Sequence, residues 1–166
     1  MISFDQTISK QIHALGLGHM KVWAVISEIG LWFFIPLAVW VWFLYGWNAD
    51  VARMIFLSIF IGFFGVMLMR SIIKRPRPTT IKTDYKAMFQ WSFPSLHASV
   101  GFSAATILAL LLVAQGGWIL WLIAVLLVTF ASLVSVTRLF VGVHYATDIA
   151  VGAVIGMMIG TLVYVL

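Results

Sequence analysis

Cysteine is absent from the 166-residue sequence, which excludes disulfide bonds, a thiolate nucleophile and any metal site built from cysteine ligands. Charge is also scarce, since only 9% of the residues are charged while 63% are hydrophobic. An ordinary soluble domain carries about 25% charged residues. The sequence also lacks a Ser/Gly-rich or Pro-rich linker, so we expect a single membrane-embedded domain over residues 1–166.

Long uncharged runs predict an all-α fold, a polytopic membrane bundle of about five transmembrane helices. The expected spans are residues 29–47 with preceding turns from about residue 22, residues 54–69 with their flanking turns, and residues 95–114, 118–138 and 143–166. The third and fourth spans are expected to be separated by a break at Gln115-Gly116-Gly117. Trp47, Trp118 and Trp121 are expected at one membrane interface.

The N-terminal segment has a different pattern. Apolar residues recur there at spacings of three and four, from Phe4 to Leu15, which predicts an interfacial amphipathic helix. A cleavable signal peptide is not expected, because Asp5 lies in the first turn and the long apolar run begins only after Lys21. The first span is therefore expected to act as an uncleaved insertion signal.

Three short polar clusters interrupt the apolar chain. They are Arg70-x6-Arg77-Pro78, Pro94-Ser95-Leu96-His97 and Thr137-Arg138-x5-His144-x3-Asp148. Ionisable groups at membrane depth cost about 2.5 to 3.5 kcal/mol each for Arg or Asp at a helix centre, so they usually serve a function. Following the chain through the expected spans brings all three clusters to the same membrane face, where nine of the ten basic residues would lie.

The residue types in these clusters suit phosphate chemistry. Arginine is always charged and binds phosphate oxygens through two N–H groups, so Arg70, Arg77 and Arg138 are candidate headgroup ligands. Ser95 at a helix start is expected to add its hydroxyl and nearby backbone N–H groups. Thr137 offers a further hydroxyl to the same phosphate.

The histidines supply the reactive groups. His144 and Asp148 are four residues apart and therefore adjacent on a helix, so the carboxylate can hold one ring nitrogen protonated while the other attacks phosphorus. His97 is left to protonate the leaving group and then to activate water. An alternative is that the same three residues form a metal site with two histidines and one carboxylate. The nearby arginines would repel a divalent cation, so we expect no metal or cofactor.

At these positions the sequence resembles the type 2 phosphatidic acid phosphatase superfamily, whose pattern is Lys-x6-Arg-Pro, Pro-Ser-Gly-His and Ser-Arg-x5-His-x3-Asp. The resemblance implies a membrane hydrolase that cleaves lipid phosphates through a phosphohistidine, without a metal. The sequence departs from the pattern at Arg70, Leu96 and Thr137. Arg70 and Thr137 keep the charge and the hydroxyl, whereas Leu96 replaces a glycine that would let the backbone approach the phosphate closely.

The N-terminal part, with Phe4-Asp5 and Ser27-Glu28-x-Gly30, is similar to bacterial undecaprenyl-diphosphate phosphatases of this superfamily. That similarity implies a polyprenyl diphosphate or a related lipid phosphate as substrate. It also implies a bacterial inner membrane, with the active face toward the cell envelope outside the cytoplasm. A lipid-linked phosphotransferase is an alternative that Leu96 favours, and a non-catalytic protein that binds or transports lipid headgroups is another.

The remaining polar residues have more general expected roles. Glu28 is expected to pair with Arg70, Lys74 or Arg138 and to orient that residue. Lys82 and Lys86 suit either the headgroup or a loop at the lipid surface. The basic clustering does not indicate nucleic acid, because the sequence offers no soluble domain on which a duplex would lie. Membrane lipids and the lipid substrate are the expected partners. Close helix packing is the expected role of Gly152, Gly156 and Gly160.

Overall fold

The structure is a computed structural model that describes residues 2–78 and 90–166, apart from the side chains of Ile2, Ser3 and Met20. Lys82 and Lys86 lie outside the described residues. The elements are α1 (Ile2–Gly16), a short 3-10 helix η1 (Leu17–His19), α2 (Met20–Trp32), α3 (Phe34–Leu44), α4 (Ala49–Ile73), α5 (Leu96–Ala114), α6 (Trp118–Phe140) and α7 (Ala146–Val165). No β-strand occurs in the two described ranges, and the predicted all-α fold is confirmed.

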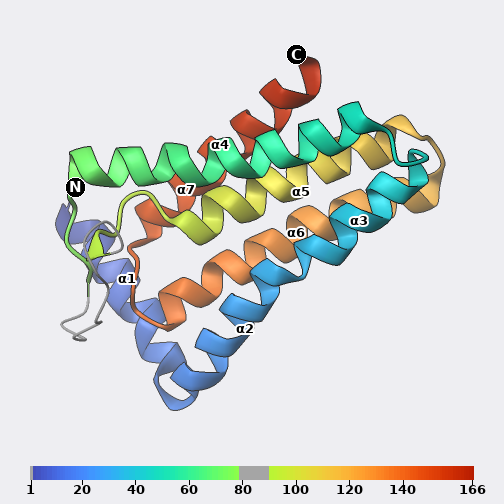
Figure 1. Cartoon of the computed structure of the whole chain (residues 1–166). Helices are drawn as coiled ribbons and strands as arrows, with labels where there is room; N and C mark the ends of the chain where they lie inside the picture. Colours follow the sequence, from blue (N-terminus) through green and yellow to red (C-terminus); the bar gives the residue numbers. More distant parts are fainter. Residues whose placement is uncertain (1, 79–89) are drawn as a thin grey trace.

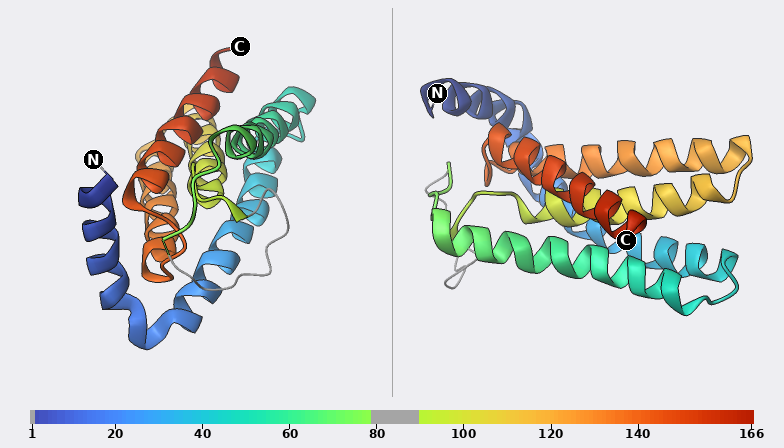
Figure 2. Two further views of the ribbon diagram at one scale, coloured as in Figure 1. Left: turned by 90° about the vertical axis from the view of Figure 1, so that its left-hand side faces the viewer. Right: turned by 90° about the horizontal axis from the view of Figure 1, so that it is seen from above.

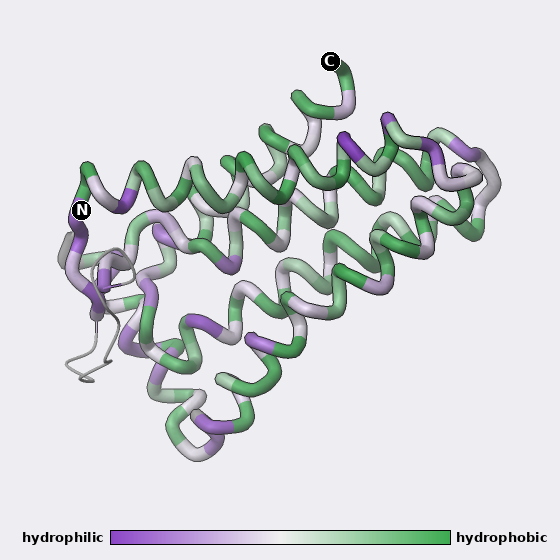
Figure 3. Tube along the Cα trace, viewed as in Figure 1, coloured by the Kyte–Doolittle hydropathy of each residue, from purple (hydrophilic) through white to green (hydrophobic). Residues whose placement is uncertain are grey.

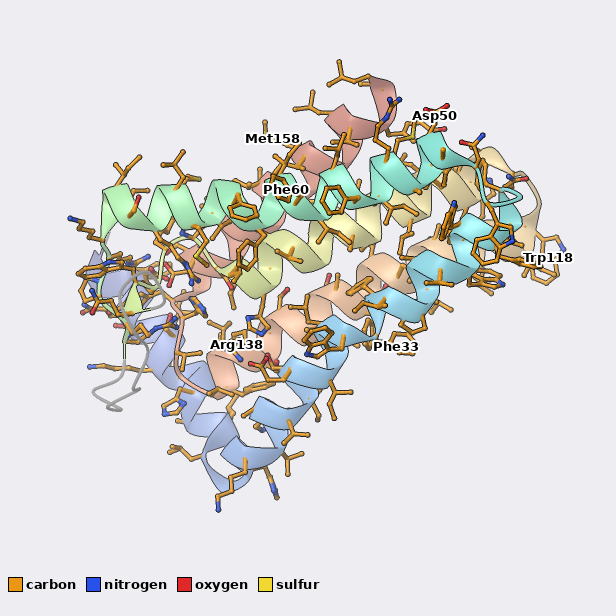
Figure 4. All side chains as sticks on the ribbon, viewed as in Figure 1. Phe33, Asp50, Phe60, Trp118, Arg138 and Met158 are labelled. Atoms are coloured by element: carbon orange, nitrogen blue, oxygen red, sulfur yellow. The ribbon has the colours of Figure 1, made fainter. Side chains whose placement is uncertain are left out.

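Five helical segments are long and apolar enough to cross a membrane, so the predicted polytopic bundle is confirmed. The first of them, Lys21–Leu44, contains both α2 and α3. It begins one residue before the predicted first turns, which started at about residue 22, and ends three residues before the predicted end at residue 47. The two helices meet at Phe33, three residues before Pro36 (Figure 4). Proline has no backbone N–H, so the Trp32 carbonyl lacks the donor that an unbroken helix would give it, and the helix breaks here.

Local sequence signals explain where the spans end. Asn48 caps α4 by accepting hydrogen bonds from the backbone N–H groups of Asp50 and Val51 at 2.8 and 3.2 Å. Gly116 and Gly117 have φ angles of 78° and 89° and form the turn between α5 and α6, as predicted.

The two ends of the bundle differ in polarity. Hydrophilic residues are concentrated at the end that holds α1, while hydrophobic residues cover the lengths of the spans (Figure 3). Arg138 lies toward that hydrophilic end, whereas Trp118 and Asp50 lie at the opposite end (Figure 4). Trp47, Trp118 and Trp121 are more than half exposed and are placed to contact the interface on that opposite side.

Helix α5 is at the centre of the bundle, in contact with α3, α4, α6 and α7. Figure 2 shows α7 crossing α5 obliquely. The crossing is close because Gly152 and Gly156 present no side chain to α5, so a methyl group on either would collide with the backbone carbonyl of Ser95 or Ser99. Gly160 meets Ser103 and Thr106 in the same way, which confirms the predicted packing role of all three glycines.

Helix α1 lies along the hydrophilic end, where it contacts α6 and α7 (Figure 1). The predicted helix is present, but two of its polar side chains are turned to the protein and not to water. Asp5 and Ser9 are buried at 6% and 4% exposure, whereas Phe4 and Leu15 are 71% and 80% exposed. The helix therefore contacts the protein partly through Asp5 and Ser9, while Phe4 and Leu15 are available to the membrane interface.

Candidate active site

A cavity of about 270 Å³ lies where the three polar clusters meet. Its ionisable lining residues are Glu28, Arg70, Arg77, His97, Arg138 and His144, and its apolar lining residues are Leu31, Trp32 and Leu96. These side chains come from α2, α4, α5, α6 and the segments after α4 and α6. The three clusters thus meet at one end of the bundle, and their location at one face of the membrane stays a prediction.

Three arginines surround the cavity and are held in place by the protein. The Nε of Arg70 donates to the Pro94 carbonyl at 2.9 Å, and Arg70 is only 2% exposed. Arg77 donates through Nη1 to the carbonyl of Val143 at 2.8 Å. Arg138 donates through Nη1 to the Ser27 hydroxyl at 2.9 Å.

Some of the guanidinium N–H groups lack an acceptor among the described residues. Nη2 of Arg70 and Nε of Arg138 are buried and form no hydrogen bond within residues 2–78 and 90–166. Buried donors without an acceptor are rare and costly in proteins. The oxygens of a phosphate group would satisfy these donors and neutralise the positive charges, so the cavity is suited to an anionic headgroup.

His144 lies between the arginines and Asp148, in the segment that joins α6 to α7. It is 1% exposed, and its Nε2 is 3.4 Å from Nη1 of Arg77. Arginine has no lone pair to offer, so a hydrogen bond here forms only with an unprotonated Nε2, which corresponds to the tautomer that carries its proton on Nδ1. Nδ1 is 3.4 Å from Oδ2 of Asp148, within ion-pair distance although not aligned as a hydrogen bond.

The electrostatic surroundings keep the imidazole neutral. Burial and the positive charges of Arg77, Arg70 and Arg138 lower the pKa of His144 well below its ordinary value of 6.5. A neutral ring with its lone pair on Nε2 is the form of histidine that attacks an electrophile. The arrangement therefore places a neutral imidazole beside three arginines.

Glu28 joins Arg138 to the second histidine. Its Oε1 is 3.3 Å from Nη1 of Arg138 and 3.3 Å from Nε2 of His97. The contact with His97 lacks hydrogen-bond alignment, but the carboxylate is close enough to stabilise a protonated imidazole. Of the three partners expected for Glu28, the structure places Arg138 beside it.

Not every predicted site residue faces the cavity. Ser95 caps α5, and its hydroxyl accepts from the Ala98 N–H at 3.4 Å, so Leu96 and His97 are the residues of this cluster that line the cavity. The Thr137 hydroxyl donates to the carbonyl of Val134 at 2.6 Å within α6. Lys74 is exposed and lines a separate cavity.

The sequence predicted no site role for several residues that lie near the reactive groups. Asp5 and Arg75 bind one another and the first turn of α7, and Ser27 binds Arg138. Arg75 belongs to a run of basic residues, and the sequence does not show which of them binds inside the protein. Asp5 is 70 residues away along the chain, so only the docking of α1 brings the pair together.

In the two described ranges, no three His, Asp or Glu side chains are grouped in a way that would hold a metal ion. Asp148 is separated from the cavity by His144, and its oxygens already accept from Arg75 and from the Tyr145 N–H. Metal-independent chemistry stays a prediction that an assay with a chelator can test.

These features define an all-helical membrane domain with a cationic cavity at one end. A family model described as the PAP2 superfamily matches residues 51–166, and the chain belongs to that superfamily. Its match begins in α4 and includes all three polar clusters.

Similar proteins include enzymes that act on lipids. The chain is 30% identical over 156 residues to the decaprenylphosphoryl-5-phosphoribose phosphatase of Mycobacterium tuberculosis, covering 90% of this chain and 76% of that protein. It is 26% identical over 124 residues to sphingosine-1-phosphate phosphatase 2 of Homo sapiens, covering 71% of this chain and 31% of the relative. The chain thus spans about a third of the length of that relative.

Two crystal structures share the fold. The PAP2-type phosphatidylglycerolphosphate phosphatase from Bacillus subtilis aligns with a TM-score of 0.74 at 24% identity, covering 98% of this chain and 83% of that one. Aquifex aeolicus LpxE aligns with a TM-score of 0.67 at 22% identity, covering 96% and 94%.

Proposed function

We propose that the protein is an integral membrane phosphatase that hydrolyses a polyprenyl diphosphate, or a related lipid phosphate, through a phosphohistidine on His144. The observation that carries the proposal is the position of His144, whose Nε2 faces a cavity lined by three arginines. Such a cavity binds and neutralises a phosphate while a nucleophile approaches the phosphorus.

In the first step, the Nε2 lone pair of His144 attacks phosphorus and the bond to the lipid-side oxygen breaks. Asp148 stabilises the imidazolium that forms, because its Oδ2 lies 3.4 Å from Nδ1. His97, beside Glu28, gives its proton to the departing oxygen. In the second step, His97 takes a proton from water, the water oxygen attacks phosphorus, and the bond to Nε2 breaks to release phosphate.

A lipid substrate is favoured by the position of the cavity and by an apolar groove nearby. A groove of about 280 Å³ lies between α3 and α4, with Ile35, Val39, Ile55 and Ile59 among its lining residues. Ile35 lies four residues after the cavity residue Leu31, with the break at Phe33 between them. A hydrocarbon chain in this groove would run along α3 toward the end of the bundle that holds the arginines, and we propose that such a lipid enters sideways from the bilayer.

A polyprenyl carrier is our preferred lipid because of the sequence resemblance described above. The mycobacterial relative, by its name, acts on a decaprenyl-linked phosphate, which supports the same class. The sphingosine-1-phosphate phosphatase relative supports the broader class of lipid phosphates. We place the protein in the bacterial inner membrane with its cavity outside the cytoplasm.

The test measures phosphate release by purified protein in detergent with excess chelator, comparing a polyprenyl diphosphate with phosphatidic acid. We expect chelator-resistant release that is faster with the diphosphate. His144→Ala is expected to lose at least about 1,000-fold in kcat, as losses of a nucleophile do. His19→Ala is the matched control because His19 is exposed and lies outside the cavity. Release abolished by the chelator, or retained by His144→Ala, would contradict the proposal.

A lipid-linked phosphotransferase is the second candidate, favoured by Leu96. This residue lines the cavity where the superfamily pattern has glycine, so its side chain reduces the room in which water reaches the phosphorus. A transferase would release little phosphate alone but would move the group to an added alcohol or lipid acceptor. Phosphate release without any acceptor, at a rate unaffected by adding one, excludes this candidate.

A further inference from the structure

A cluster of charged side chains behind the cavity joins three segments that are distant in sequence. Arg75 donates through Nη1 to Oδ1 of Asp148 and to the Thr147 hydroxyl, both at 2.7 Å, and through Nη2 to Oδ2 of Asp5 at 2.7 Å. Its guanidinium carbon lies 3.9 Å from the ring centroid of Tyr145. One arginine is thus fixed by two carboxylates, a hydroxyl and an aromatic ring.

Asp5 is itself firmly held at the first turn of α7. Its Oδ1 accepts from the Thr147 N–H at 3.2 Å, and its Oδ2 accepts from the Thr147 hydroxyl at 2.5 Å. Burial raises the pKa of Asp5, but the hydrogen bonds from Thr147 and Arg75 outweigh burial and lower it overall. Ser9, one turn further along α1, accepts from the Ala146 N–H at 3.0 Å.

The cluster accounts for the contacts of Asp148 on the side away from His144. Oδ1 accepts from Arg75, while Oδ2 accepts from the Tyr145 N–H at 2.9 Å and faces His144. Asp148 is fully buried, so its orientation is decided by these partners and not by water. Neither Arg75 nor Asp5 lines the cavity of the arginines and histidines.

We infer that Arg75, held by Asp5 of α1, is a positioning residue that fixes the Asp148 carboxylate and, through it, the tautomer and ring orientation of His144. The inference rests on the proposed phosphohistidine function and extends it to the N-terminal helix. Helix α1 then belongs to the reactive apparatus as well as to the membrane surface. Groups that orient a metal-bound histidine from behind contribute factors of about 10 to 100, and we expect the same scale for His144.

The kinetic test compares Arg75→Met and Asp5→Ala with wild type in the lipid phosphatase assay. We expect kcat to fall on the order of 10-fold to 100-fold while KM stays within about twofold, because the substrate contacts are untouched. Arg53→Met and Asp50→Ala are matched controls, since these residues form an exposed ion pair at the other end of the bundle. Equal kcat values for Arg75→Met and its control would overturn the inference.

A double-mutant cycle tests whether Asp5 acts through Arg75. Asp5→Ala is expected to cost little more in kcat when Arg75 is already methionine, whereas independent roles would make the two losses multiply. If Arg75→Met does not fold, Arg75→Lys keeps the charge but loses the forked contact. It is expected to fold and to show the same fall in kcat with unchanged KM.

A spectroscopic measurement separates this inference from the proposed function. Nitrogen NMR of ¹⁵N-histidine-labelled protein, with His144→Asn to assign the signal, reports which ring nitrogen of His144 carries the proton. We expect the Nδ1-protonated tautomer in wild type and an increased share of the Nε2-protonated tautomer in Arg75→Met. That change in a protein without phosphatase activity would refute the function and support the positioning role. If the wild type is active and the His144 signal is unchanged in Arg75→Met, the proposed function is supported and the positioning role is refuted.

Discussion

At the scale of single residues, the site depends on a histidine that is both buried and surrounded by positive charge. His144 is 1% exposed, and burial and its arginine neighbours lower its pKa well below 6.5. In the unfolded chain the same histidine has a pKa of about 6.5. The folded protein therefore resists protonation of a group that the unfolded chain protonates readily.

This difference predicts how stability depends on pH. As pH falls below about 6.5, the unfolded state binds a proton at His144 that the native state does not, so the free energy of unfolding decreases, by up to about 1.4 kcal/mol per pH unit. Unfolding midpoints in detergent between pH 7 and pH 5 measure the effect. His144→Gln is expected to show a shallower decline than wild type, while His19→Gln, at an exposed site, keeps the wild-type decline. Parallel curves for wild type and His144→Gln would show that the histidine is not held neutral.

The positions of several cavity residues follow from helix spacing and are therefore predictable from the sequence. The ends of the spans determine where Arg70, His97 and Arg138 lie, and hydropathy alone predicts those ends. The hydroxyls of Ser95 and Thr137 each have a local partner that the sequence did not indicate, an N–H for Ser95 and a carbonyl for Thr137, so their predicted contact with phosphate stays a prediction. No local pattern predicts that Arg75 bridges Asp5 and Asp148, since that contact forms only when α1 docks.

At the scale of helices, the contact between α5 and α7 sets the position of the reactive groups. Asp148 lies in the first turn of α7, and His97 lies in the first turn of α5. The Ser95 N–H donates to the Asp148 carbonyl at 2.9 Å, so the starts of the two helices are joined directly. Glycines along α7 allow the backbones to approach closely.

Gly156→Ala is therefore expected to destabilise the protein by about 1 to 3 kcal/mol, the usual cost of an extra methyl group in a packed interface. The new Cβ would collide with the Ser99 carbonyl and the Phe102 Cβ, so α7 must move away from α5. Gly65→Ala in α4 is the matched control. Its Cβ would meet nothing within 4 Å, so the better helix propensity of alanine should stabilise the protein by about 0.5 to 1 kcal/mol. Equal unfolding midpoints for the two variants would contradict the packing argument.

Helix faces were harder to predict than helix positions. The apolar spacing in residues 4–15 correctly predicted a helix, and the exposure of Phe4 and Leu15 suits the membrane interface. A helical wheel cannot distinguish a polar side turned to water from one turned to protein hydrogen-bonding groups. Asp5 and Ser9 are turned to the protein, because they accept hydrogen bonds from N–H groups in the first turn of α7 that have no acceptor within that helix.

At the scale of the whole molecule, the polarity of the two ends bears on orientation in the membrane. The positive-inside rule counts lysines and arginines in loops and, applied to the sequence, places the active face in the cytoplasm. The structure removes several residues from that count. Arg70 and Arg138 are buried at 2% and 5% exposure, and Arg75 is paired with two carboxylates. The excess of free lysines and arginines at this end is therefore smaller, and an active face outside the cytoplasm is compatible with it.

The absence of cysteine makes this orientation directly measurable, because a single introduced cysteine is the only thiol in the protein. Lys10→Cys places a thiol on the exposed side of α1 at the active face, and Asp50→Cys places one at the opposite end. In right-side-out membrane vesicles, we expect a membrane-impermeant maleimide to label Lys10→Cys and to spare Asp50→Cys, with the reverse in inside-out vesicles. Detergent-solubilised protein, in which both sites must react, is the control for thiol accessibility. The opposite labelling pattern would place the cavity in the cytoplasm and require the lipid phosphate to be supplied from the inner leaflet.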